Sequence, residues 1–250
     1  MGGKPAKTEA SALYDAYAHA QRLAARDLLA FTGTLAPRTI LEPGCGTGLY
    51  TRMLRDAFPA ASILAVDLLQ QRVDAARNTI VSPLIGFLAA DAEELPFAPY
   101  DLITSNAAFQ WFRKMPLTIR RFARMLTDGG VLSYSFFGPG TYRELDGAMR
   151  DVFGGSAAVA ARGFAGRDAL GSALAACFSR WDIEERTYTR TFPSLMELLR
   201  SIKFTETRGM PSGGRFLWSR GTLARLEESY TARWGCIRAS YQVYLCKGER

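Results

Sequence analysis

The 250-residue chain is 48% hydrophobic and 22% charged, with a net charge of +7, and these proportions are those of an ordinary globular protein. It has no run of about eighteen apolar residues, and residues 1–7 lack the apolar core of a signal peptide, so we expect no membrane span and a cytoplasmic location. The only histidine is His19, and no two of the four cysteines share a CxxC spacing, which argues against a metal site, a disulfide framework and a histidine-based catalytic triad.

Short apolar runs alternate with amphipathic stretches along the chain. Strands are expected at 39–41, 62–66, 85–90, 100–105, 131–137, 181–191 and 237–246. Helices are expected at 10–30, 48–58, from about 68 to 78, 116–126, 142–153, 167–178, 195–203 and 222–233, with a turn at 128–130. This alternation predicts an α/β, Rossmann-like fold with a mostly parallel seven-stranded sheet and helices on both faces.

A helical cap is expected between the last two strands, which complete the sheet. Residues 1–191 and 235–250 would form the main domain, and residues 192–234 the inserted cap. Residues 198–238 carry a net charge of +5, most of the excess of the whole chain. The basic residues there are Arg200, Lys203, Arg208, Arg215, Arg220, Arg225, Arg233 and Arg238. Such an excess indicates an acidic partner, a nucleic acid or a membrane surface, unless it is only a solvated face.

The segment Glu42-Pro43-Gly44-Cys45-Gly46-Thr47-Gly48 lies between a predicted strand and a predicted helix. Glycines there let the backbone turn sharply and approach a ligand, and the helix start favours an anionic or strongly hydrogen-bonding group. Asp67 ends the next strand, where a carboxylate can accept both hydroxyls of an adenosine ribose. The spacing is G-x-G-x-G, and Leu49 stands where the dinucleotide fingerprint G-x-G-x-x-G has its last glycine, which favours S-adenosylmethionine over NAD.

Residues 40–48 resemble motif I of class I methyltransferases. The resemblance implies that the glycine loop contacts the methionine part of S-adenosylmethionine, that Asp67 binds the ribose and that Leu68 packs on adenine. Asp91 resembles the residue that reaches the exocyclic amine of adenine, although it could equally cap a helix at 92–94. Asn106 resembles the residue that faces the methionine carboxylate or the reaction centre. The cofactor-binding residues implied are Gln21, Glu42, Gly44, Cys45, Gly46, Gly48, Asp67, Leu68, Asp91, Ala92, Asn106 and Gln110.

The segment after the fourth strand, Asn106-Ala107-Ala108-Phe109, lacks the prolines typical of base-amine methyltransferases. Residues 14–21, 105–111, 138–145 and 192–203 resemble instead the malonyl-acyl-carrier-protein O-methyltransferases, the BioC family of biotin synthesis. This resemblance covers about residues 10–203. It implies that the chain methylates the free carboxylate of a malonyl thioester on acyl carrier protein, or on coenzyme A, and that S-adenosylhomocysteine is the product.

A malonyl carboxylate is ionised at neutral pH, so its methylation requires no general base. Catalysis would then depend on alignment of the reactants in a dry, aromatic pocket. The substrate-positioning residues expected are Tyr14, Tyr17, Trp111, Tyr142 and Arg143, with Phe109 as a further wall. Arg143 would hold the malonyl carboxylate or the thioester oxygen, unless it is only a surface charge on a helix.

Acyl carrier proteins are small and strongly acidic, so a basic surface could serve as their landing site. The +5 segment would form this surface together with Arg113, Lys114, Arg120, Arg121 and Arg124. We expect no nucleic acid and no membrane as partners. The alternatives are a methyltransferase acting on another small acid, a quinone or a lipid, an NAD-dependent oxidoreductase, and a basic nucleic-acid-binding protein.

Overall fold

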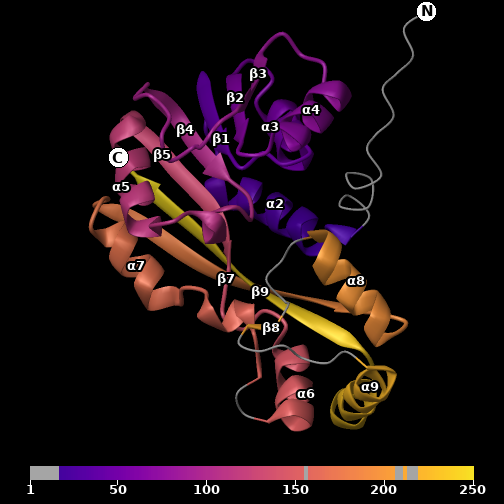
Figure 1. Cartoon of the computed structure of the whole chain (residues 1–250). Coiled ribbons are helices and arrows are strands. Elements are labelled where there is room, and N and C mark those ends of the chain that lie inside the picture. The colour runs from indigo at the N-terminus through magenta and orange to yellow at the C-terminus, as the bar shows by residue number, and fades with distance from the viewer. Residues whose placement is uncertain (1–16, 155–156, 206–210, 213–218) are drawn as a thin grey trace, which may run out of the picture. The chain divides into compact units, whose positions relative to one another are not determined.

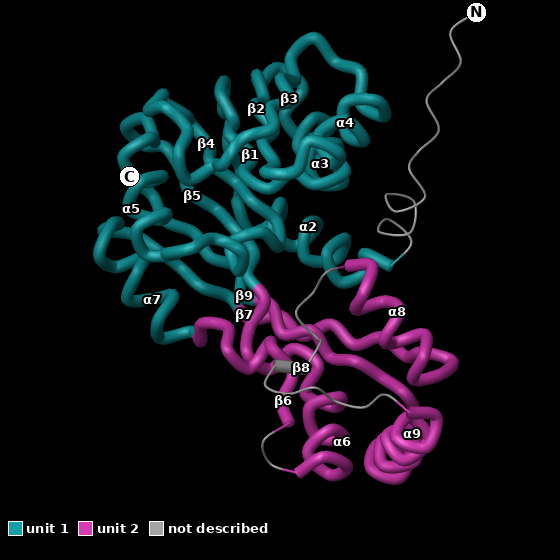
Figure 2. The backbone as a smooth tube through the Cα atoms, in the orientation of Figure 1, with its two compact units in different colours: residues 1–136, 167–184, 244–250 teal, residues 137–166, 185–243 magenta. Residues whose placement is uncertain are grey.

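The computed structural model describes residues 17–154, 157–205, 211–212 and 219–250. The chain divides into two compact units (Figure 2). Unit 1 comprises residues 1–136, 167–184 and 244–250, and unit 2 comprises residues 137–166 and 185–243. The predicted cap, residues 192–234, falls within unit 2, which also takes in residues 137–166. The cap as a domain of its own stays a prediction.

The chain has an α/β fold built on a seven-stranded sheet, as predicted (Figure 1). The strands are β1 (Thr39–Pro43), β2 (Ser62–Asp67), β3 (Ile85–Ala89), β4 (Tyr100–Ser105), β5 (Leu126–Phe137), β7 (Arg180–Thr191) and β9 (Arg238–Glu249). The helices are α2 (His19–Thr32), α3 (Leu49–Ala57), α4 (Gln70–Thr79), α5 (Met115–Met125) and α7 (Arg167–Ala175), with a 3₁₀ turn η1 (Phe109–Trp111). Strands β5, β7 and β9 contribute residues to both units.

The strands lie in the order β3-β2-β1-β4-β5-β9-β7. From β1 the chain adds strands towards one edge of the sheet and from β4 towards the other, so the switch point lies between β1 and β4. Strands β1 to β5 pair in parallel, and Leu41 of β1 lies opposite Ile103 of β4. The loops that follow β1 and β4 therefore leave the same edge of the sheet side by side. In open α/β sheets, ligands bind at the carboxyl ends of the strands at such a switch point.

The central strands are buried, as expected for parallel strands that helices cover on both faces. Residues 40–43 of β1 and 102–105 of β4 are all buried. Helix α4 lies against β2 and β3, α2 packs against α3, and α5 packs against α7. Tyr50, Thr51 and Leu54 form the buried side of α3, the helix that begins directly after the glycine loop. This packing fixes the start of α3, and with it the position of the loop.

Unit 2 contains α6 (Arg143–Phe153), β6 (Ala158–Val159), a 3₁₀ turn η2 (Ala160–Gly163), α8 (Leu195–Thr205), β8 (Pro211–Ser212) and α9 (Arg220–Trp234). Helices α6 and α9 approach each other closely at Gly147. A Cβ at this glycine would lie 2.8 Å from Cη2 of Trp234, so a larger residue would push the helices apart. Arg233 of α9 also pairs with Asp151 of α6 at 3.2 Å.

Most predicted elements are found within a few residues of their expected bounds, and the differences have local causes. Residues 128–130, predicted as a turn, lie inside β5, where the pairing with β4 shifts register after Tyr100. Gly129 has a φ of +76°, so the expected bend is absorbed as an irregularity within one strand. In the described ranges, no helix combines the length and apolarity needed to cross a membrane.

Candidate cofactor site

The glycine loop between β1 and α3 adopts left-handed backbone conformations. Gly44, Gly46 and Gly48 have φ angles of +76°, +55° and +86°, which residues with a Cβ rarely adopt. A Cβ at Gly44 would lie 2.3 Å from Cβ of Ala108, and one at Gly48 would lie 2.5 Å from Cδ1 of Ile80. A Cβ at Gly46 would meet no described atom within 4 Å. Gly44 and Gly48 therefore allow close packing of the loop, whereas Gly46 borders open space.

Hydrogen bonds fasten this loop to the end of β2. The Gly44 N–H donates to the Val66 carbonyl oxygen at 2.7 Å, and the Gly46 N–H donates to Oδ2 of Asp67 at 2.9 Å. Oδ1 of Asp67 accepts from the Leu69 N–H at 3.0 Å. Each carboxylate oxygen has two lone pairs, so each keeps one further acceptor position. The sequence indicates Asp67 as a ribose ligand but not as a residue that also shapes the loop.

Leu68, which follows Asp67, is 69% exposed, an unusual fraction for a leucine beside a buried strand end. Ala92, in contrast, is 6% exposed. Leu68 thus offers uncovered apolar surface next to the Asp67 carboxylate, as its predicted contact with adenine requires. That contact stays a prediction.

The loops after β1 and β4 touch at the switch point. Oγ of Ser105 donates to the Pro43 carbonyl oxygen at 2.7 Å, and Gly44 lies against Ala108. Residues from both loops therefore come together at one edge of the sheet.

Asn106, predicted to face the methionine carboxylate or the reaction centre, uses its side-chain amide within the protein. Its Nδ2 donates to the Gln21 carbonyl oxygen at 3.0 Å, and its Oδ1 accepts from Oγ of Ser135 at 2.8 Å. Ser135 also accepts from the N–H of Ala107, whose φ is +54°. The network joins α2, β5 and the loop after β4, and it brings Gln21 and Asn106 together. No local pattern in the sequence indicates Ser135.

Two buried oxygen atoms at this edge have no hydrogen-bond partner among the residues that the structure describes: Oε2 of Glu42 and Oε1 of Gln110. Glu42 is 1% exposed, and burial, with a smaller contribution from the charge of Asp67, raises its pKa to about 8. The Glu42 carboxyl is therefore mostly protonated at neutral pH. Because an unpartnered buried polar atom costs free energy, a ligand with N–H donors would be favoured here.

Cys45 lies in the same loop but is not a nucleophile. Its side chain is 5% exposed, and burial, followed by the charges of Glu42 and Asp67, raises the pKa of the thiol far above its ordinary value. A protonated thiol reacts poorly, so the residue contributes packing. All four cysteines are free, and the described part of the chain holds no cluster of three metal-ligating side chains.

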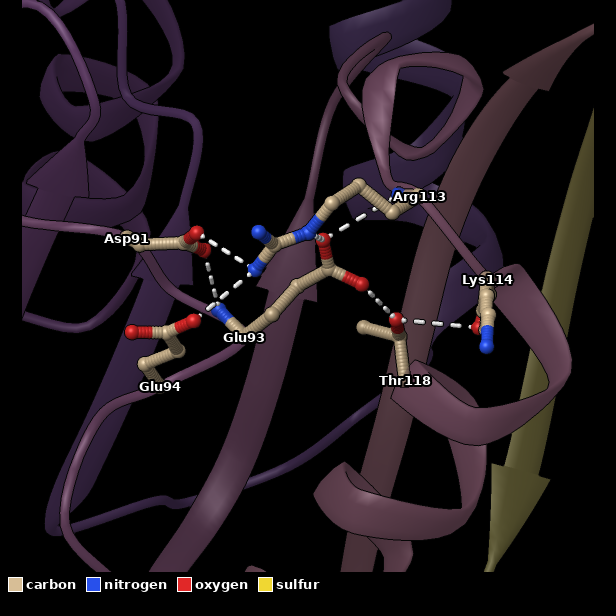
Figure 3. Close-up of polar contacts among 6 residues, drawn as sticks. All are labelled: Asp91, Glu93, Glu94, Arg113, Lys114 and Thr118. Atoms are coloured by element: carbon tan, nitrogen blue, oxygen red, sulfur yellow. Dashed lines mark hydrogen bonds and ion pairs between the residues drawn. The ribbon is translucent and has the colours of Figure 1, made fainter.

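Asp91 follows β3 and opens a short acidic turn (Figure 3). Its Oδ1 accepts from the Glu93 N–H at 2.9 Å, and its carbonyl oxygen accepts from the Glu94 N–H at 3.0 Å. Residues 92–94, all described, form a turn and not a helix. The alternative interpretation of Asp91 as a helix cap is therefore wrong.

Arg113, which lies between η1 and α5, binds all three acids of this turn (Figure 3). Its Nη2 lies 2.8 Å from Oδ2 of Asp91 and 3.0 Å from Oε1 of Glu94. Its Nε lies 3.4 Å from Oε2 of Glu93. The sequence predicts Arg113 as part of a landing surface for an acidic partner, whereas the structure engages its guanidinium with acids of its own chain.

The aromatic residues predicted to position the substrate differ in exposure. Trp111 is 45% exposed in η1, and Tyr17 is half-buried just before α2. Phe109 is buried and stacks on Tyr134, with ring centroids 3.9 Å apart, so it is a core residue and not a pocket wall. Tyr14 lies outside the described residues.

Tyr142 and Arg143 stand at the start of α6 in unit 2. Tyr142 is fully buried with a φ of +60°, and its ring meets that of Tyr241 edge-on at 5.0 Å. The Arg143 side chain is 62% exposed, and its Nε lies 3.4 Å from Oε1 of Glu144. Glu144 is buried and accepts from both the N–H and the Oγ of Ser240. Arg143 is thus more accessible to a ligand than Tyr142, and the roles of both stay predictions.

Comparison with known proteins identifies the family. A family model described as a methyltransferase domain matches residues 41–134. A malonyl-[acyl-carrier protein] O-methyltransferase of Methylococcus capsulatus is 35% identical over 247 residues, which cover 95% of this chain and 89% of the relative.

Solved structures agree on the fold. The YcgJ protein of Bacillus subtilis has a TM-score of 0.63 at 14% identity, covering 91% of this chain and 98% of that one. Phosphoethanolamine N-methyltransferase 2 of Haemonchus contortus, solved with S-adenosyl-L-methionine, has a TM-score of 0.57 at 16% identity, covering 95% of this chain and 56% of that one. The chain therefore belongs to the family of malonyl-[acyl-carrier protein] O-methyltransferases and is a methyltransferase that uses S-adenosylmethionine.

Proposed function

We propose that the chain transfers the methyl group of S-adenosylmethionine to the free carboxylate of a malonyl thioester on acyl carrier protein, and releases S-adenosylhomocysteine. The observation that carries the methyl-donor half is the glycine loop fastened to Asp67 beside the β1–β4 switch point. The malonyl thioester as methyl acceptor is supported by the relative from Methylococcus capsulatus, a malonyl-[acyl-carrier protein] O-methyltransferase that aligns with 95% of this chain. A basic nucleic-acid-binding protein finds no support in these similarities.

The residues at the switch point fit this cofactor. Gly46 borders space for the methionine part, and Asp67 keeps acceptor positions for the ribose hydroxyls. The unpartnered oxygens of Glu42 and Gln110 suit an ammonium group. We assign to the cofactor Gln21, Glu42, Gly44, Cys45, Gly46, Gly48, Asp67, Leu68, Asp91, Ala92, Asn106 and Gln110, of which Asn106 acts by holding Gln21.

When bound, the cofactor supplies an electrophilic methyl group on a sulfonium centre. A carboxylate oxygen of the substrate forms the new O–CH₃ bond while the S–CH₃ bond breaks and its electron pair passes to sulfur. No proton moves, so the chain has no need of a general base. The one histidine in the chain, His19, lies exposed at the start of α2. The chain contributes alignment of the reactants, which is worth up to about 7–11 kcal/mol in favourable cases.

Arg143 is assigned to the malonyl group, with Tyr14, Tyr17 and Trp111 as positioning residues. Tyr142, which is fully buried against Tyr241, would act by holding the start of α6 and with it Arg143. A bidentate grip on the reacting carboxylate would stabilise the ground state, so we assign Arg143 to one carboxylate oxygen or to the thioester carbonyl. The 62% exposure of its side chain leaves donors available for this contact.

Some of the basic residues that we assign to the landing surface for the carrier protein are occupied by contacts within the chain. Arg113 binds the acidic turn, Arg121 bonds to the Leu95 carbonyl oxygen, and Arg124 lies over the Phe97 ring. Lys114 and Arg120 are exposed, and Arg220 of the predicted cap is exposed in unit 2. Arg208 and Arg215 lie outside the described residues. The cytoplasm as the compartment stays a prediction.

Transfer of a radiolabelled methyl group from S-adenosylmethionine to malonyl-carrier protein tests the proposal. Acetyl-carrier protein, which has no free carboxylate, should accept no label, and the Asp67→Ala variant should transfer none. Labelling of malonyl-coenzyme A without labelling of malonyl-carrier protein would show that the substrate is the coenzyme A thioester. If S-adenosylhomocysteine binds but no malonyl thioester is labelled, the malonyl thioester is not the substrate.

A further inference from the structure

One arginine pairs with all three acids of the turn that follows β3. Asp91, Glu93 and Glu94 place three carboxylates within four residues, and the Arg113 guanidinium contacts every one of them (Figure 3). The hydrogen bond to Glu94, followed by the charges of Asp91 and Glu93, raises the pKa of Arg113 above its ordinary value. Without this cation, repulsion among the three acids would spread the turn.

Other contacts hold the same turn independently of that guanidinium. Oγ1 of Thr118 donates to Oε1 of Glu93 at 2.5 Å, and the main-chain N–H of Arg113 donates to Oε2 of Glu93 at 3.1 Å. Burial disfavours the ionised form of Glu93, but these hydrogen bonds and the charge of Arg113 outweigh it and lower its pKa. Loss of the guanidinium should therefore leave Glu93 fixed while releasing Asp91 and Glu94.

Asp91 depends on Arg113 for the placement of one oxygen. Oδ1 is held by the Glu93 N–H at 2.9 Å, and Oδ2 is held by Nη2 of Arg113 at 2.8 Å. Both bonds come from donors and hold the carboxylate in a single orientation, with one lone pair left on each oxygen. The side chain remains 31% exposed, so an N–H donor from a ligand can reach it. An acceptor in the same place would be repelled.

We propose that Arg113 is a positioning residue that gives the cofactor site its preference for a 6-amino purine over a 6-oxo purine, by orienting the Asp91 carboxylate. This inference rests on the proposed function, in which Asp91 receives the amine of adenine. Adenine presents an N–H donor at this position, whereas hypoxanthine presents an oxygen acceptor. Arg113 acts through Asp91, so its effect belongs to cofactor selection.

Calorimetric titration with S-adenosylhomocysteine and its 6-oxo analogue, S-inosylhomocysteine, tests this role. The wild type should bind S-adenosylhomocysteine at least about tenfold more tightly than the 6-oxo analogue. Arg113→Ala should weaken S-adenosylhomocysteine binding about tenfold while leaving the analogue nearly unchanged, so the ratio approaches one. Arg113→Lys should restore part of the ratio, because a lysine keeps the charge but loses the fork of donors.

The matched control is Arg26→Ala, which removes an exposed arginine of α2 and should leave both affinities unchanged. In an Asp91→Ala background, Arg113→Ala should have no further effect on the ratio. Because Arg113 is 64% exposed, its loss should leave the protein folded. Equal weakening of both ligands by Arg113→Ala, or no weakening, would overturn the inference. A wild type that binds neither ligand would instead overturn the proposed function.

Discussion

Gly44 and Ala108 approach so closely that a Cβ built on the glycine would lie 2.3 Å from the alanine Cβ. This contact joins the loops after β1 and β4, and Gly44 also has a φ of +76°. Gly44→Ala should therefore lower the free energy of unfolding by about 3 kcal/mol, from overlap and backbone strain together. Urea denaturation monitored by circular dichroism measures this loss, and an unchanged midpoint would contradict the packing described.

Gly46, only two residues further along, should respond differently. A Cβ there meets no described atom within 4 Å, so Gly46→Ala carries only the strain of its φ of +55°, about 1 kcal/mol. The added methyl group would enter the space that we assign to the cofactor, so S-adenosylhomocysteine should bind at least about tenfold more weakly. Calorimetric titration of the folded variant checks this. If Gly46→Ala binds S-adenosylhomocysteine as tightly as the wild type, the cofactor does not lie beside Gly46.

Glu42 should make the stability of the protein depend on pH. Burial raises its pKa from 4.5 to about 8, so between these values the folded chain holds one proton more than the unfolded chain. Its contribution to stability is therefore fully present below pH 4.5 and is lost as the pH rises to 8, by about 1.4 kcal/mol per unit.

Glu42→Gln isolates this contribution, because the amide does not titrate and the other ionisable groups are shared. The free energy of unfolding of the wild type relative to the variant should fall between pH 5 and pH 8 by on the order of 3 kcal/mol. Denaturation curves at four pH values suffice, and parallel pH profiles of the two proteins would show that Glu42 titrates normally.

Arg143 should affect the substrate and not the cofactor. Arg143→Ala is expected to raise the KM for malonyl-carrier protein about tenfold, because a hydrogen bond to a charged group is lost, with S-adenosylhomocysteine affinity unchanged. Buried Glu144 keeps its two hydrogen bonds from Ser240, so unit 2 should stay folded. Arg162→Ala removes another exposed arginine of unit 2 and serves as the control. Unchanged steady-state kinetics in Arg143→Ala would remove the residue from the site.

Association with the acidic carrier protein should weaken with salt. Exposed charge pairs are screened within about 10 Å at 0.1 M salt, so the dissociation constant should rise steadily over the range from about 50 to 500 mM sodium chloride. S-adenosylhomocysteine affinity, measured over the same range, provides the comparison. A carrier-protein affinity indifferent to salt would argue against a basic landing surface.

The parts of the fold and site that the sequence predicts well are those with local causes. The strand, glycine bend and helix at residues 39–57 follow from neighbouring residues, and the place of Asp67 follows from the length of one βα unit. Contacts between distant segments could not be predicted in this way. Arg113 meets Asp91 across 22 positions and Ser135 meets Asn106 across 29, and no spacing rule links such partners. The same reason explains why the sequence assigns Arg113 to a landing surface and does not predict its contacts with the acidic turn.

The hydrogen bond from the Gly46 N–H to the Asp67 carboxylate has a consequence for redesign of the enzyme. The Asp67 side chain both holds the glycine loop and is proposed to bind the ribose. A substitution at this position would therefore change the loop conformation and ribose binding together. Acceptance of donors modified on the sugar would have to be engineered through Leu68 and other neighbours, with the aspartate retained. Any variant with an altered preference for the methyl donor must therefore retain Asp67.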